Sequence, residues 1–416
     1  MLKERYIQFG FLVLIFSIQN VFSQSVVQIE KRAMESFKNN QFAVAKVDFQ
    51  QLLARYPESP SYNFYYGVCL FQAEDKNKAK RYLEFSINQS ATFCDAHFYL
   101  GKIYHLAYQF DEAIASYEKY KSCNPSDPLH ATTEIEYCKN GKSLLASPKS
   151  LQLLSRQISA ESNFFQKYDL EAIGGKIYAD ITLQTKLDKK KAHVPICYFK
   201  RGETYKFYSS FGPDHEQQKI YFIQRISQDV WSKPTEIPLS SGTASLLYPY
   251  FDPQNKCLFF SSDGFNSMGG YDLFKVSFDP ETNSLGEVQN LDFPFSSAAD
   301  DYFYIPLNAD GSQAWMCSNR NSTIGNVEVL QIQSASYSGN LVAVNGVFND
   351  LVAPKNKRIQ ITVKDLSDGK SYGPFTSDST GNYQVILPGS GSYLFQAKID
   401  GTEDRKSTRL NSSHAN

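Results

Sequence analysis

The sequence carries almost no net charge, and this argues against two classes of partner. Its 42 lysine and arginine residues are balanced by 43 aspartate and glutamate residues, which leaves a formal net charge of −1. A nucleic-acid surface is usually basic, because it must neutralise phosphates. A patch for anionic lipids needs a similar excess of lysine and arginine. We therefore expect neither nucleic acid nor a lipid surface as a partner.

The sequence also lacks the short motifs of common hydrolases and zinc enzymes. Neither the Gly-x-Ser-x-Gly nucleophile elbow nor the His-Glu-x-x-His zinc motif occurs. The six histidines do not cluster along the chain. Cys94 and His97 lie one helical turn apart, but a closed metal site takes about four ligands and no second pair is visible. We therefore predict no catalytic residues, no cofactor, no metal and no enzymatic activity.

The seven cysteines lack the pattern of a disulfide framework. Their number is odd and their spacing is wide, whereas disulfide scaffolds carry even numbers at short spacings. Most have apolar neighbours, as Cys69 and Cys257 do, which is typical of buried cysteines. A bridge between two cysteines of the N-terminal third is compatible with the sequence, but the spacing does not identify the pair.

No apolar run near the N-terminus is long enough to span a bilayer as a helix. Phe9–Ile18 follows a short basic start and has about the length of a signal-peptide core. Val21 and Ser23 occupy the −3 and −1 positions of a small-residue cleavage site. We therefore expect residues 1–23 to be a cleaved signal peptide, and the mature chain to be exported without a transmembrane span. A buried core segment is the alternative.

The first third of the chain contains a repeat of 34 residues. Small residues, alanines and large apolar residues each recur at this spacing. They are Ala33, Gly67 and Gly101; Ala45, Ala79 and Ala113; and Phe49, Leu83 and Tyr117. Apolar residues within a unit follow helical spacing, and Asn39–Asn40 separates two helices. The pattern predicts helix pairs in which the small residue allows close approach and the large residue fills the gap.

This pattern resembles the tetratricopeptide repeat family. The third unit carries the resemblance best, in Leu100-Gly101-x-x-Tyr104, Ala113, Tyr117 and Pro125. The resemblance implies an α-helical solenoid over residues 24–147, with three repeats and a capping helix. In this family the concave face binds proteins or peptides. The alternative for this chain is that the solenoid only braces neighbouring domains. The candidate exposed contacts on that face are Asn63, Tyr66, His97 and Lys102.

From residue 148 onward, short runs of β-branched and aromatic residues follow Gly-, Pro- and Asp-rich turns. The runs are 176–181, 219–223, 256–261 and 313–318. The fullest unit, 248–274, includes Ser261-Ser262-Asp263 and Gly269-Gly270-Tyr271-Asp272-Leu273, and a fainter copy runs from Ile158 to Ile181. These units resemble blades of TolB-like, WD40-like β-propellers. The resemblance implies a β-propeller-like domain over 148–335, in which Asp263 and Asp272 bond backbone instead of forming a catalytic or calcium site.

Residues 336–403 continue the β-rich pattern. Thr376-x-Asp378-x-x-Gly381-x-Tyr383, followed by Leu387-Pro388-Gly389, resembles the carboxypeptidase regulatory-like, transthyretin-like domain. It implies a small β-sandwich, here incomplete. The tail, residues 404–416, resembles translated read-through of a sequencing-library adapter. We expect the tail to be an artefact outside the fold.

The order of these segments resembles a set of Gram-negative envelope proteins of the OmpA family, some of them associated with type IX secretion. The resemblance implies a multidomain, α-then-β scaffold in the periplasm or at the outer membrane, with protein partners. It also implies peptidoglycan contact, but only through an OmpA-like domain that these residues do not include. One alternative is a glycan-binding propeller with exposed aromatics at its mouth. The other is a propeller hydrolase with His193 or His215 against paired carboxylates.

Overall fold

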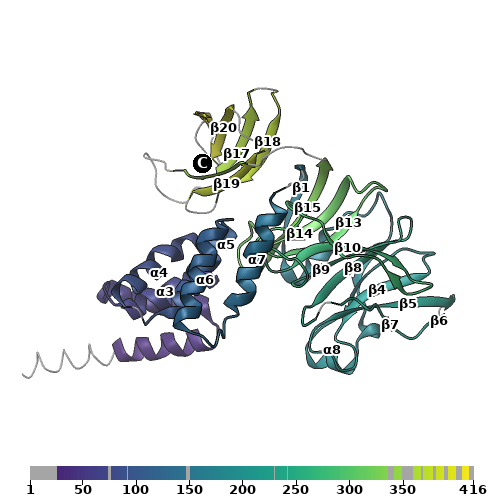
Figure 1. The fold of residues 1–416 in the computed structure, drawn as a ribbon, viewed down its shortest axis with the longest axis horizontal. Helices are drawn as coiled ribbons and strands as arrows, with labels where there is room; N and C mark the ends of the chain where they lie inside the picture. The colour runs from purple at the N-terminus through teal and green to yellow at the C-terminus, as the bar shows by residue number, and fades with distance from the viewer. Residues whose placement is uncertain are drawn as a thin grey trace, which may run out of the picture. The chain divides into compact units, whose positions relative to one another are not determined.

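The computed structural model forms two compact units, Met1–Ile135 and Glu136–Asn416 (Figure 1). The residues it describes are 26–73, 76–90, 92–146, 150–228, 230–240, 242–335, 342–348, 359–366, 369–377, 381–387, 392–399 and 405–411. The expected signal peptide, residues 1–23, lies outside the described residues. The units divide inside a helix, between Ile135 and Glu136, whereas the sequence placed a domain boundary at residue 147.

The first unit is built from helices of similar length joined by short turns. After helical residues 26–38 come α2 (Phe42–Arg55), α3 (Pro60–Ala73), α4 (Lys76–Gln89), α5 (Cys94–Leu106), α6 (Phe110–Cys123) and α7 (Ala131–Leu144). The predicted break at Asn39–Asn40 is a turn in which Asn40 has a φ of 58°. Helices α2 and α6 end two residues before Pro57 and Pro125, because proline cannot continue a helix. Helix α7 begins in the first unit and continues into the second, and its role as a capping helix stays a prediction.

The repeat positions pack as the 34-residue spacing predicts. A Cβ atom at Gly101 would lie 2.5 Å from Cε1 of Tyr117, and one at Gly67 would lie 3.0 Å from Cδ2 of Leu83. Both large side chains are fully buried. The glycines therefore let the two helices of a pair come close enough for the large residue to fill the space between them. This confirms the inference drawn from the sequence.

The second unit is strand-rich and contains three antiparallel sheets made mainly of consecutive strands. The first sheet holds β4 (Tyr205–Ser210), β5 (Lys219–Ser227), β6 (Val230–Trp231) and β7 (Thr235–Glu236). The second holds β8 (Leu246–Asp252), β9 (Cys257–Ser262), β10 (Asp272–Asp279), β11 (Ser284–Leu285) and β12 (Gln289–Asn290). The third holds β13 (Asp301–Pro306), β14 (Gln313–Ser318), β15 (Asn326–Ala335) and β1 (Ser150–Ala160).

Strand β1 joins the third sheet, although it lies at the other end of this region in the chain. It pairs antiparallel with β15, with Ser150 opposite Ala335 and Ala160 opposite Asn326. The expectation of a strand-turn-strand unit from Ile158 to Ile181 is therefore wrong. Ile158 lies in β1, whereas β2 (Lys176–Ala179) pairs with β3 (Ile196–Phe199). All four predicted runs nevertheless contain strands: 176–181 contains β2, and the other three fall in β5, β9 and β14.

An aromatic cluster packs these sheets together. It includes Phe164 from the 3₁₀ helix η1 (Glu161–Lys167), Tyr302 and Phe303 from β13, and Trp315 from β14. The Tyr168 hydroxyl donates a hydrogen bond of 2.7 Å to the Phe303 carbonyl, which satisfies its buried polar atom. The cluster thus joins the segment after β1 to strands more than a hundred residues later.

The C-terminal strands form one sheet of four and one of two. The larger sheet has the order β18 (Ser371–Thr376), β17 (Ile359–Asp365), β20 (Ser392–Ile399) and β21 (Arg405–Asn411). The smaller pairs β16 (Val342–Val347) with β19 (Asn382–Leu387). Strand β21 pairs with β20 from Arg405 to Asn411. The expectation that residues 404–416 stay outside the fold is therefore wrong for 405–411, because the edge of β20 offers backbone hydrogen bonds to any extended segment. The artefactual origin of the tail stays a prediction.

Candidate functional site

One of the four candidate contacts, Asn63, is not an exposed contact. Its side chain is only 5% exposed, and its amide donates 2.9 Å hydrogen bonds to the carbonyls of Pro57 and Ser59. A buried amide needs such partners, because leaving it unpaired would cost free energy. Asn63 therefore holds the turn between α2 and α3, and the expectation that it lies exposed on the concave face is wrong.

Lys102 is half-buried and bonded to helix α7. Its ammonium lies 2.9 Å from Oε1 of Glu134 on α7, and Nδ1 of His105 lies 3.3 Å from Oε2 of the same carboxylate. The Tyr117 hydroxyl also donates to this carboxylate, over 3.4 Å. Burial alone would raise the pKa of Glu134, but the positive charge of Lys102 and the contact with His105 outweigh burial and lower it to about 2. Glu134 is the centre of this cluster, and no pattern in the sequence singled it out.

Tyr66 and His97 are both half-buried and engage different neighbours. Tyr66 makes an edge contact with Tyr82, with ring centroids 4.8 Å apart. His97 lines an open hollow of about 520 Å³ together with Lys119 and Cys123. Burial, and then the charge of Lys119, lower the pKa of His97. Their role as partner contacts, like that of Lys102, stays a prediction.

A disulfide connects the two helices of the third repeat. Cys94 begins α5, Cys123 ends α6, and their Cα atoms are 5.7 Å apart, within the usual range for a bridge. A bridged sulfur is not a thiolate ligand, so this bond removes Cys94 from any metal site with His97. The sequence did carry a signal, since 94 and 123 are the first and last helical positions of one repeat and therefore meet in an antiparallel pair.

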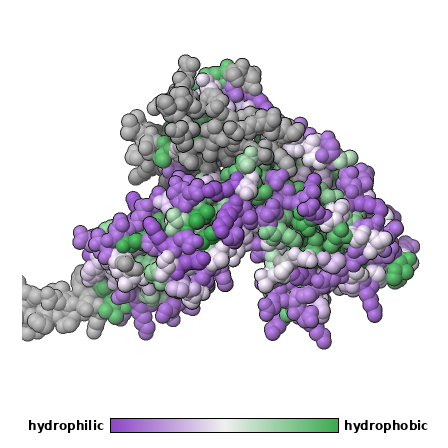
Figure 2. Space-filling view, in the orientation of Figure 1, coloured by the Kyte–Doolittle hydropathy of each residue, from purple (hydrophilic) through white to green (hydrophobic). Residues whose placement is uncertain are grey.

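Across the described residues, no group of three or more histidine, cysteine, aspartate or glutamate side chains is arranged to hold a metal ion. Within the same ranges, no helix is long and apolar enough to cross a membrane. The visible face of both units is largely hydrophilic, with hydrophobic residues in separate patches (Figure 2).

Asp263 and Asp272 have structural roles, as the sequence predicts. Oδ2 of Asp272 accepts from the backbone N–H of Met268 and from the Asn290 amide, both at 2.9 Å, and Asp272 is fully buried. Oδ1 of Asp263 accepts from the backbone N–H of Ser245 at 2.8 Å. Each carboxylate thus fixes the loop next to a strand.

The histidines named for the hydrolase alternative meet different partners. Nε2 of His193 lies 2.9 Å from the Ser209 carbonyl. Nε2 of His215 lies 2.9 Å from Glu236, whose carboxylate also accepts from the Tyr221 hydroxyl at 3.1 Å. Neither arrangement is a histidine between paired carboxylates, which is what the hydrolase alternative requires.

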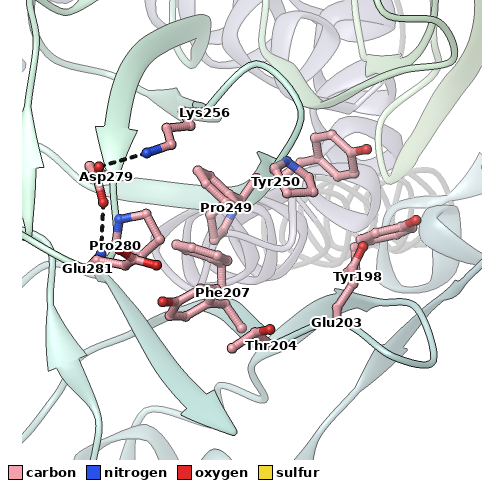
Figure 3. Close-up of a pocket in the computed structure, with 13 residues that line it drawn as sticks. Tyr198, Glu203, Thr204, Phe207, Pro249, Tyr250, Lys256, Asp279, Pro280 and Glu281 are labelled. Carbon is pink, nitrogen blue, oxygen red and sulfur yellow. Dashed lines mark hydrogen bonds and ion pairs between the residues drawn. The ribbon is translucent and has the colours of Figure 1, made fainter.

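The strand-rich unit contains a cavity of about 340 Å³. It opens between the first and second sheets, beside the turn that follows β3 (Figure 3). Five aromatic and three proline side chains line it, with four charged groups. These residues are Tyr198, Tyr205, Phe207, Tyr250 and Phe251; Pro249, Pro253 and Pro280; and Glu203, Lys256, Asp279 and Glu281. No sequence pattern predicts this site, because its residues come from separate segments spread over about eighty positions.

Comparisons with known proteins concern the helical part of the chain. Residues 31–84 match the family model described as tetratricopeptide repeat. No curated protein matches the chain. Together with the packing at Gly67 and Gly101, the family match identifies the N-terminal part as a helical solenoid of the tetratricopeptide kind.

Several solved structures resemble part of the chain. The first repeat domain of Spaghetti (RPAP3) bound to an HSP90 peptide is 15% identical; the match covers 29% of this chain and 94% of that one, with a TM-score of 0.27. MamA is 23% identical over 28% of this chain and 68% of its own, also with a TM-score of 0.27. The Yersinia enterocolitica type III secretion translocator chaperone SycD is 13% identical over 29% and 88%, with a TM-score of 0.27.

Proposed function

We propose that this chain is a non-enzymatic scaffold that binds protein or peptide partners through its tetratricopeptide repeats. The observation that carries the proposal is the family match over residues 31–84, on helices whose small and large positions pack as that repeat requires. Stacked helix pairs leave an extended surface on one side, and such surfaces bind other proteins. Tyr66 lies on α3 and keeps part of its side chain accessible, so a crosslinking group at this position can reach a partner.

Site-specific photo-crosslinking tests this proposal. A benzoylphenylalanine residue replaces Tyr66 in one variant and Ala115, an exposed residue of α6, in a matched control. After irradiation in the native host, we expect a discrete crosslinked product from position 66 and none from position 115. Equal products from both positions, or none from position 66, would contradict partner binding at this face.

We also propose that the protein is exported and works in the periplasm or at the outer membrane. The apolar run and small-residue cleavage site at the N-terminus support export. The bridge between Cys94 and Cys123 supports it independently, because such bonds persist in oxidising compartments. Mass spectrometry of protein from the envelope fraction should find Gln24 as its first residue, with both cysteines resistant to alkylation. An intact N-terminus or two free thiols would argue against export.

We further propose that residues 148–335 form a β-propeller and that 336–403 form a transthyretin-like sandwich. The antiparallel sheets of consecutive strands support the propeller. So does the pairing of β1 with β15, which brings the two ends of the region into one sheet. Alternation of buried and exposed residues along β17 supports the sandwich. An experimental structure of the full chain tests both, and an open row of sheets without a common axis would contradict the propeller.

Peptidoglycan anchoring is the last part of the proposal, and it depends on an OmpA-like domain beyond residue 403. Re-sequencing of the gene across the codon for Glu403 tests this part. A frame that continues into such a domain supports anchoring, and a peptidoglycan pull-down then follows. A frame that ends with the sandwich removes the basis for anchoring but leaves the repeat-based scaffold unaffected.

A further inference from the structure

We propose that the cavity between the first and second sheets binds a single lysine or arginine side chain, presented by a protein partner. The cavity has an aromatic wall and an excess of carboxylates over cationic groups. This inference is independent of the helical repeats, because every lining residue belongs to the strand-rich unit.

The walls of the cavity are aromatic and firmly held. Tyr198 and Tyr250 meet edge to face with centroids 5.0 Å apart, and both are almost fully buried. Phe207 and Phe251 also line the cavity, with ring centroids 4.7 Å apart. Aromatic faces attract ammonium and guanidinium groups, and the attraction grows when the cation loses part of its water. The packed rings therefore form a preformed surface for a cationic side chain.

The charged groups at the rim favour a cation over a neutral ligand. The Lys256 ammonium lies 2.9 Å from Oδ2 of Asp279 and compensates that carboxylate. Glu203 and Glu281 add two further carboxylates at the cavity, and the nearby charge of Lys200 compensates Glu203 in part. Burial raises the pKa of Glu203, which is a sign that this carboxylate is only partly compensated in the structure. A second cation placed in the cavity would complement both glutamates.

The lining offers carboxylates, which only accept hydrogen bonds, and the hydroxyls of Thr204, Tyr205 and Tyr250, which can donate or accept. Proline has no backbone N–H, so the three lining prolines contribute no backbone donor. The Tyr198 hydroxyl already donates to the Gly174 carbonyl at 3.0 Å, and Lys256 donates to Asp279. Lysine offers three N–H donors and arginine five, with no acceptor, so both match this lining. A neutral sugar could also bond to these hydroxyls and carboxylates, but unlike a cation it gains no charge attraction from the glutamates.

The size of the cavity suits one side chain. Its volume of about 340 Å³ lies at the lower end of the range of roughly 300–1,000 Å³ that is usual for ligand pockets. A polymer would have to lie outside, with one group inserted. The aromatic walls belong to strands β3, β4 and β8, so paired strands hold this part of the cavity in place.

Calorimetric titration of the full chain with blocked amino acids tests the proposal. The probes are Nα-acetyl-lysine amide and Nα-acetyl-arginine amide, compared with Nα-acetyl-norleucine amide, which has a similar stem without the charge. N-acetylglucosamine serves as the neutral sugar. We expect binding of the two cationic probes, at least tenfold weaker binding of norleucine, and weaker lysine binding at 0.5 M salt.

Charge-removing variants connect the binding to the cavity. Glu203→Gln combined with Glu281→Gln should weaken lysine binding about tenfold, because two charged acceptors are lost. Glu171→Gln removes an exposed carboxylate outside the cavity and should leave binding unchanged. Unchanged melting of all three proteins shows that the fold is intact. The proposal is overturned if wild-type protein binds norleucine as well as lysine, binds neither cationic probe, binds only the sugar, or keeps its lysine affinity in the double variant.

Discussion

Replacing Gly101 with alanine gives a sharp test of the repeat packing. The added Cβ atom would lie 2.5 Å from Cε1 and 2.6 Å from Cδ1 of Tyr117. Carbon atoms normally approach to about 3.5 Å, so the ring must move by roughly 1 Å. It has little room, because Tyr117 is fully buried, packs on Phe98 with centroids 5.6 Å apart, and donates to Glu134.

Two opposing effects set the size of the loss. Overpacking of a filled core costs about 1–3 kcal/mol, and the rigid ring places Gly101→Ala near the upper end. Alanine is better than glycine in a helix by about 1 kcal/mol, which offsets part of the cost. The net expectation is a loss of about 2 kcal/mol. At Gly67 the added atom would lie 3.0 Å from Leu83, an aliphatic side chain that adjusts more easily. Gly67→Ala should therefore be close to neutral.

Thermal unfolding followed by circular dichroism at 222 nm measures the helical unit within the full chain. We expect Gly101→Ala to lower its midpoint by roughly 8 °C, and Gly67→Ala to change it little. Adding Tyr117→Leu, which copies the second repeat, should make Gly101→Ala nearly harmless in that background. A Gly101→Ala midpoint at or above that of the wild type would refute the packing argument, and so would a failure of Tyr117→Leu to reduce the loss.

Three further predictions concern buried charges and the disulfide. The pKa of Glu134 is lowered to about 2 from an ordinary 4.5, so its contribution to stability is present above pH 4.5 and is lost as the pH falls toward 2. Glu134→Gln should lower the free energy of unfolding by up to about 3 kcal/mol at pH 7. The urea midpoint of this variant should therefore change less with pH between 4.5 and 2 than that of the wild type. Reduction of the Cys94–Cys123 bridge should lower the free energy of unfolding in urea by about 3 kcal/mol. The same reductant should not affect a variant in which both cysteines are replaced by serine. Arg320→Met leaves the buried carboxylate of Asp301, which lies 2.5 Å from the guanidinium, without its cation, and should lower the free energy of unfolding by about 3–5 kcal/mol. We expect loss of the near-ultraviolet circular dichroism signal, and a wild-type signal and melting point would contradict this.

The sequence predicted the features that depend on neighbouring residues. The helix pairs follow from a 34-residue spacing, and the spacing directly places Gly101 beside Tyr117. The run 313–318 coincides with β14, because a continuous run of apolar residues between turns is a local signal of a buried strand. The pairing of β1 with β15 joins residues about 175 positions apart, and no local pattern identifies such a partner.

The site residues were harder to predict for a related reason. Helical phase assigned Asn63 to a face, but whether its amide is exposed depends on the carbonyls of the preceding turn. The helical pattern pointed to Lys102 but not to Glu134, because Glu134 lies on another helix. Cysteine spacing left the pairing open until the ends of α5 and α6 were placed side by side. In each case the missing information was the position of a neighbour in space.

Strand β21 raises the question of how much a paired segment contributes to a fold. Backbone hydrogen bonds accept almost any extended sequence at a free edge, so pairing with β20 does not show that residues 405–411 stabilise the sandwich. Among the side chains that the structure describes, the buried core of the sandwich runs from Ile359 to Phe395. We therefore expect a chain ending at Glu403 to melt within about 2 °C of the full chain, because an exposed edge pairing adds little net free energy. Differential scanning calorimetry measures this, with removal of β20 as a control that should unfold the sandwich. A large loss on removing the tail alone would mean that its side chains pack, and the tail would then belong to the fold.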